Sequence, residues 1–133
     1  MITGLIAAVV VALGGLWWFS GHDTYQVYTA ETVTIAGASY PVRRFEGVAV
    51  PGSPELTRAC FRIDEEVRAP PELNPRPNAG PPWFKCFSAR FIAEQLASED
   101  GKAYLAESDD PVGYDRVIAV LPGRRVYMWR QPN

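Results

Sequence analysis

The chain has 133 residues, and 13 basic against 15 acidic side chains give it a net charge of −2. This balance lacks the basic face that phosphate binding requires, so we expect no nucleic acid among its partners. A single histidine, His22, and two cysteines exclude most histidine-based metal centres and closed cysteine-type zinc sites. We expect no metal and no other cofactor.

The N-terminal run of residues 2–19 contains no charged side chain, and its only polar one is Thr3. Such a run is about 27 Å long as a helix, close to the roughly 30 Å thickness of a bilayer core. Trp17 and Trp18 stand at its end, where indole rings favour the membrane interface. The sequence therefore predicts a transmembrane anchor over residues 1–22, surrounded by lipid bilayer, and an extramembrane domain over residues 23–133.

Two alternatives for this run are a cleaved signal peptide and a buried helix of a soluble protein. No lysine or arginine precedes the run, and the ending Trp-Trp-Phe does not fit a small-residue cleavage site. The lack of any polar face disfavours a soluble helix. We expect a retained anchor.

Small residues recur along one side of the run, at Gly4, Ala8, Ala12 and Gly15. Small residues let another helix approach closely, which drives helix association inside lipid. This stripe predicts an interface with the transmembrane helices of a larger complex. Glycine and alanine are also common in membrane spans without any such role.

The orientation of the chain depends on charges and on the two cysteines. The first basic residue after the run is Arg43, so the positive-inside rule is weak here, and Asp23 slightly favours a cytoplasmic N-terminus. Cys60 and Cys86 form an isolated pair, which in a small extracytoplasmic domain is readily a disulfide. Two buried thiols in the cytoplasm are the alternative. We expect a disulfide, and a single-pass protein of the inner membrane whose C-terminal domain is periplasmic.

The first half of the extramembrane domain is predicted to form β-strands. Segments 25–28, 32–35, 40–50 and 56–63 are rich in β-branched and aromatic residues, and a turn at 36–39 makes the second and third of them a hairpin.

A proline-rich loop follows at residues 69–82, with six prolines in 14 residues. Proline fixes φ and removes a backbone donor, so neither a helix nor a central strand runs here. We expect an extended loop pinned near its ends by Cys60 and Cys86. A proline-rich recognition motif is the alternative.

Short helices are expected next. Ser88 is a suitable N-cap for a helix with Ile92 and Leu96 on one face, and Ser98 with two acids behind it predicts a second helix. The segments 116–121 and 125–129 are strands of a hairpin around a Pro-Gly turn. The fold class expected is α+β: one N-terminal transmembrane helix, then a small extramembrane domain with antiparallel hairpins and one or two short helices.

Catalytic motifs are absent from the sequence. It contains no glycine-rich phosphate loop, no CxxC, no CxxCH and no HExxH. We expect a protein that is not an enzyme and has no catalytic residues.

Charge is unevenly distributed along the chain. The segment from residue 94 to 115 holds seven acids and one base, whereas residues 116–133 hold four arginines and no acid. Acids gathered on one face attract a basic partner such as a basic cytochrome, whereas acids neutralised by neighbouring arginines do not. The possible acidic docking patch consists of Glu94, Glu99, Asp100, Glu107, Asp109 and Asp110.

Three stretches carry a family resemblance: RACF at 58–61, WFKCF at 83–87, and GYDRVIAV at 113–120 followed by Tyr127 and Trp129. With them the chain resembles a small alphaproteobacterial family of unknown function, whose members have one N-terminal span and a compact extramembrane domain. The resemblance implies an accessory subunit of the haem-copper cytochrome c oxidase, or of its supercomplex with the cytochrome bc complex.

The expected function is therefore that of a non-catalytic accessory subunit of a respiratory membrane complex. It docks by its single span and modifies the outer surface or the stability of that complex. The alternative is a membrane-anchored periplasmic assembly or redox factor that uses Cys60 and Cys86 on a client.

Overall fold

The structure is a computed structural model that describes residues 25–133. The elements are β1 (Gln26–Tyr28), β2 (Thr32–Ile35), β3 (Ala38–Val50), β4 (Ser53–Ile63), α1 (Ala89–Ala97), β5 (Lys102–Glu107), β6 (Tyr114–Leu121) and β7 (Arg125–Pro132). The expected anchor over residues 1–22, its small-residue stripe and its tryptophans lie outside the described residues. Within residues 25–133, no helix has the length and hydropathy of a membrane span.

The fold is mostly an antiparallel β-sheet, and the expectation of an α+β fold is wrong. Strands make up 50% of the described residues, and helix makes up 8%. The helix expected from Ser98 does not form, because Ser98 is the C-cap of α1: its N–H donates to the Glu94 carbonyl at 3.0 Å, and the Glu99 N–H donates to the Leu96 carbonyl at 3.2 Å. The residues after it form β5, which pairs with β6 along its whole length.

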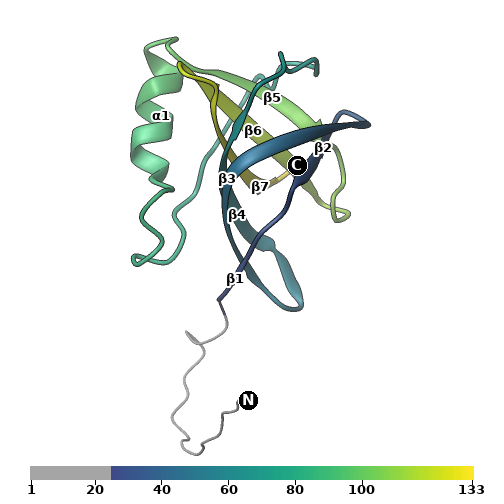
Figure 1. Ribbon diagram of the computed structural model, residues 1–133. Coiled ribbons are helices and arrows are strands. Elements are labelled where there is room, and N and C mark those ends of the chain that lie inside the picture. The colour runs from purple at the N-terminus through teal and green to yellow at the C-terminus, as the bar shows by residue number, and fades with distance from the viewer. Residues whose placement is uncertain (1–24) are drawn as a thin grey trace, which may run out of the picture.

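The sheet has seven strands in the order β1-β3-β4-β7-β6-β5, and β2 pairs with the other part of β3. It curves until β2 reaches β5, where the Ala36 N–H donates to the Ala106 carbonyl at 2.7 Å. Figure 1 shows this curved sheet with α1 lying outside it. The sheet therefore has an enclosed inner face and an outer face that α1 and the connecting loops cover.

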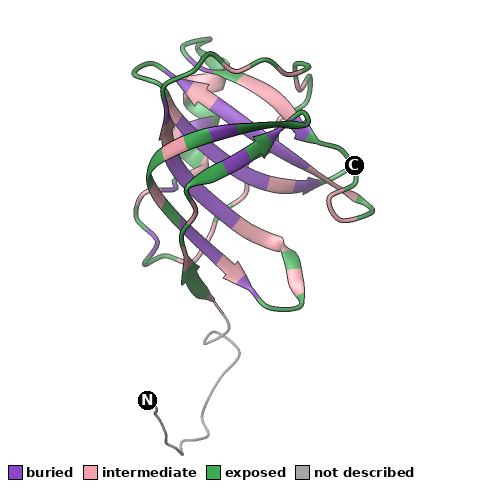
Figure 2. Ribbon diagram, turned by 45° about the vertical axis from the view of Figure 1, so that its right-hand side comes forward, coloured by how far each residue is buried: buried purple, intermediate pink, exposed green. Residues whose placement is uncertain are grey.

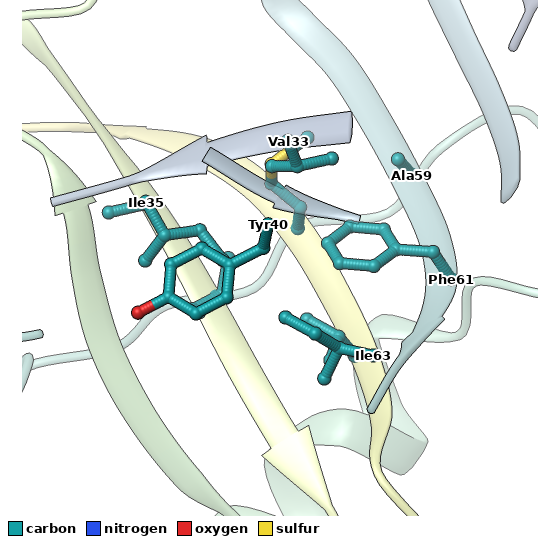
Figure 3. Packing of buried hydrophobic residues seen from close by; sticks show 10 residues of the cluster. Val33, Ile35, Tyr40, Ala59, Phe61 and Ile63 are labelled. Carbon is teal, nitrogen blue, oxygen red and sulfur yellow. The ribbon is translucent and has the colours of Figure 1, made fainter. Parts of the chain in front are cut away.

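The inner face holds the first hydrophobic core. Tyr40, Phe61 and Ile63 lie close together there with Val33 and Ile35 of β2, as Figure 3 shows. Successive side chains of a strand point to opposite faces, so these residues alternate with residues of the second core.

The outer face holds the second core, around the fully buried Trp129 of β7. The Phe87 ring lies edge-on to the Trp129 ring, with centroids 6.2 Å apart, and Ile92 of α1 is fully buried beside them. Because both faces are covered, β6 and β7 are buried along most of their length, as Figure 2 shows. This explains why residues 117–121 of β6 are all apolar instead of alternating with polar residues.

Several local expectations are confirmed. Ser88 caps α1 and its Oγ accepts from the Phe91 N–H at 3.2 Å. The β2–β3 hairpin turns at Ala36 and Gly37, both with positive φ, as a two-residue hairpin turn requires. The β6–β7 hairpin turns at Pro122 and Gly123, between paired Leu121 and Arg125.

The proline-rich loop lies along the edge of the sheet. The Glu72 N–H donates to the Ala103 carbonyl at 3.0 Å, and the Leu105 N–H donates to the Pro70 carbonyl at 2.8 Å. These bonds cover the outer edge of β5, which otherwise exposes backbone groups to pairing with another chain. The loop thus completes the sheet without forming a strand.

Gln131 of β7 ties this loop to the outer core and is 2% exposed. Its Oε1 accepts from the Arg76 N–H at 2.7 Å and from Trp129 Nε1 at 2.9 Å, and its Nε2 donates to the Asn74 carbonyl at 3.0 Å. Buried polar groups are costly unless bonded, so these three bonds keep the loop in place.

Cys60 of β4 and Cys86 of the loop before α1 are joined by a disulfide. Cys60 lies on the outer face, packed with Tyr127 and Phe87. The bond holds the end of the proline-rich connection against the sheet.

Replacing both cysteines, Cys60→Ser with Cys86→Ser, is expected to lower the free energy of unfolding by about 3 kcal/mol, because the unfolded chain regains the freedom of a loop of about 26 residues. Urea unfolding measures this loss. Reductant should destabilise the wild type and leave the double variant unchanged, and equal stability of the two proteins without reductant would contradict the prediction.

Replacing Gln131 by leucine is expected to cost roughly 2–4 kcal/mol, because the Arg76 N–H and the Trp129 indole N–H then lose their buried acceptor. Thermal unfolding followed by tryptophan fluorescence measures the loss. Gln26→Leu, at an exposed position of β1, is the control and should change stability little.

Candidate functional site

The main candidate site is a cavity of about 560 Å³ at one end of the inner face. Its apolar wall includes Tyr28, Val33, Phe45 and Met128. Its charged side chains, here called the polar wall, are Glu107, Asp110, Arg116 and Arg130, and three threonines also line the cavity. The strands that surround it come from both halves of the chain, so only the folded sheet creates it.

The two arginines are brought together by the β6–β7 register. Arg116 and Arg130 are direct cross-strand partners, two pairs beyond Ile118 and Met128. Like charges in this position repel each other. Asp110 relieves the repulsion, because its Oδ2 accepts from Arg116 Nε at 2.8 Å and from Arg130 Nη2 at 3.2 Å.

Each arginine has further acceptors. Arg116 Nη2 donates to Glu107 Oε1 at 3.0 Å, and Arg130 donates to the Pro54 carbonyl at 3.1 Å and to the Asp110 carbonyl. The remaining nitrogen of Arg116, Nη1, has one hydrogen-bond partner within residues 25–133, the thioether sulfur of Met128 at 3.4 Å. A thioether is a weak acceptor.

Burial of Asp110 acts to raise its pKa, but hydrogen bonds and charge from Arg116 and Arg130 outweigh burial, so the pKa lies below its ordinary value. Asp110 is thus held as a carboxylate between two guanidinium groups.

Tyr28 of β1 lies on the other side of the cavity. Its ring packs edge-on against Phe45, with centroids 5.2 Å apart, above Gly47. A Cβ on Gly47 would stand 2.5 Å from Tyr28 Cε1, so only glycine leaves room for this ring. Burial raises the pKa of Tyr28, although the charges of Arg130 and Arg116 act in the opposite direction.

The structure divides the six acids of the expected docking patch into two groups. Glu107 and Asp110 line the cavity and bind Arg116, while Asp109 accepts from Asn133 Nδ2 at 2.7 Å. The second group lies at α1 and its C-terminal end, at the opposite end of β5. A strand of six residues separates them by roughly 17 Å, at about 3.3 Å per residue. The second group consists of Glu94, Glu99 and Asp100.

The expected disulfide residues lie away from this cavity, on the outer face. Cys60 is 8% exposed and is bonded to Cys86, so neither presents a thiol. In residues 25–133, no group of three metal-ligating side chains is close enough to hold a metal ion.

The sequence reading missed the arginines of the cavity. The predicted hairpin could have shown that they meet. Pairing Leu121 with Arg125 around the Pro-Gly turn also pairs Arg116 with Arg130. Asp110 could not have been found in this way, because its place between them depends on the loop from β5 to β6.

A second arginine row crosses the outer face. Arg62 of β4 pairs with Arg43 of β3 and with Arg125 of β7, so three arginines occupy neighbouring positions on adjacent strands. Arg43 forms an ion pair with Asp64 at 2.6 Å, and Arg125 lies over the Phe91 ring at 6.0 Å. This row was not expected from the sequence.

Fold and site together define a small disulfide-bonded antiparallel β-domain with an ion-paired cavity on its inner face. The chain belongs to the family described as "Family of unknown function (DUF6446)", whose model matches residues 18–133. No curated protein and no solved structure matches it.

The ion pairs of Asp110 predict how the free energy of unfolding falls at acid pH. Because its folded pKa is depressed, its contribution is complete above the unfolded value of about 3.9 and is lost as pH falls through the folded pKa. Asp110→Asn should therefore cost roughly 2 kcal/mol at pH 7 and make stability less dependent on pH below about 4. Urea unfolding between pH 2 and 7 measures both effects. Asp100→Asn is the control, and equal pH profiles for the two variants would refute the role of Asp110.

Proposed function

We propose that the chain is a non-catalytic accessory subunit of a larger membrane complex, anchored in the inner membrane with its β-domain on the periplasmic side. The observation that carries this proposal is an aromatic pair at the end of the domain where the N-terminal segment joins it. Trp83 is 51% exposed, and its ring lies edge-on to that of Tyr25, with centroids 6.4 Å apart.

The distance along the chain supports this. Only residues 20–24 stand between the uncharged run and Tyr25, which is at most about 20 Å of extended chain. Val27 of β1 is 73% exposed on the same segment. Tryptophan and tyrosine favour the water interface of a bilayer, so this end of the domain suits a position next to the membrane.

The disulfide supports the periplasmic side. Disulfides persist in oxidising compartments and are rare in the cytosol. A redox or assembly factor acting through Cys60 and Cys86 has less support, because Cys60 is 8% exposed in the bonded pair.

Cytochrome c oxidase, or its supercomplex, is the partner that the sequence resemblance puts first. The acids that suit a basic cytochrome best are Glu99 and Asp100, both exposed; Glu94 is exposed too but forms an ion pair with Arg90 at 3.3 Å. Glu107 and Asp110 suit it less, since both already bind Arg116.

A pull-down of the tagged full chain from membranes in mild detergent tests the proposal, with visible absorption spectra to detect haem. The wild type is expected to bring a haem-containing complex with it. Ala8→Leu with Ala12→Leu should reduce recovery about tenfold, because larger side chains prevent close helix approach. Ala7→Leu with Val11→Leu, at the same spacing on another face, is the matched control.

Three outcomes would overturn the proposal. Unchanged recovery with the first pair of substitutions refutes docking by that face. A wild-type preparation without haem refutes the oxidase as partner. A mature chain that starts after Phe19 and is free in the aqueous fraction refutes the anchor.

A further inference from the structure

We propose that the inner-face cavity binds a small apolar molecule through one uncharged oxygen acceptor, such as the carbonyl of a ketone or an ester. The cavity measures about 560 Å³, within the range of about 300–1,000 Å³ typical of small-molecule sites. Its wall is more apolar than polar, and its four charged side chains are joined to one another by ion pairs, which agrees with the usual composition of such sites.

The first donor for this oxygen is Nη1 of Arg116. The Arg116 side chain is 8% exposed, and its other nitrogens bind Asp110 and Glu107. Among the described residues Nη1 has the Met128 sulfur as its single partner, and a buried donor without a good acceptor costs free energy. An oxygen placed in the cavity beside Met128 would remove that cost.

The second donor is the hydroxyl of Tyr28. It forms no hydrogen bond with any other residue in the described part of the chain, and its ring lines the same cavity. It is held in place by Phe45 and by the absence of a side chain at Gly47. Arg116 and Tyr28 both line the cavity and both carry hydrogen-bond donors, so together they favour a ligand with a hydrogen-bond acceptor.

The charges on the cavity wall favour an uncharged ligand over an anion. Two arginines face two carboxylates there, Glu107 and Asp110, so the polar wall is already neutral. A carboxylate or phosphate would add a negative charge beside Glu107 and Asp110, and both arginines there already bind these carboxylates, so it would be repelled. A neutral carbonyl accepts the hydrogen bond without that repulsion.

The body of the ligand would lie against Val33, Phe45, Ala49 and Met128, which line the cavity. Each methylene removed from water there contributes about 0.8 kcal/mol to binding. This inference does not depend on the membrane anchor or on any partner complex, so it stands or fails separately from the proposed function.

The test uses the two methionines of the chain, Met1 and Met128, as reporters. The full chain is labelled with ¹³C-methyl methionine in detergent, and the Met128 signal is assigned with Met128→Leu. Titration with 2-nonanone is expected to shift the Met128 signal saturably. Nonanoate, of equal chain length with a carboxylate, should bind at least about tenfold more weakly.

Two variants distinguish binding of 2-nonanone in the cavity from its partitioning into the detergent. Ala49→Trp fills the cavity and should abolish the shift, whereas Ala38→Trp, exposed on the same strand outside the cavity, should leave it unchanged. Arg116→Lys keeps the charge beside Asp110 but loses the fork of donors, and should weaken 2-nonanone binding at least about fivefold. No saturable shift, an equal shift in Ala49→Trp, or tighter binding of nonanoate would each overturn the inference.

Discussion

The pairing of β6 with β7 around the Pro122–Gly123 turn is the constraint on which the rest of the structure depends. One register places Ile118 opposite Met128 on the inner face and Val117 opposite Trp129 on the outer face. A slip of one residue would exchange the two faces of the strand, so both cores require this register. The same register sets two arginines side by side, and Asp110 makes that arrangement tolerable.

The outer face is stabilised by parts of the chain without regular structure. The proline-rich loop pairs with the edge of β5, binds Gln131 through its backbone, and ends at the disulfide to β4. Arg58 adds to this, because its buried guanidinium donates to the Leu56 and Asn78 carbonyls. A loop with few backbone donors of its own thus obtains its order from side chains of the sheet.

Charged side chains are arranged differently on the inner and outer faces of the sheet. On the inner face arginines and acids neutralise one another, which favours a cavity for an uncharged molecule. On the outer face Arg43, Arg62 and Arg125 form a row, and at α1 three acids are exposed. The surface of the domain therefore carries groups of opposite sign at separate places.

Local chemistry by itself determined the tight hairpin turns, the cap of α1 at Ser88 and the extended, non-helical backbone of the proline-rich loop, because turn residues, caps and prolines act within a few residues. Tertiary structure decided the fold class. Residues after Ser98 suit a helix locally, but β6 offers them a strand partner, and pairing satisfies their backbone groups and buries Ala106. The cavity was decided in the same way, since Tyr28, Asp110 and Arg116 meet only when the sheet curves and brings distant strands together.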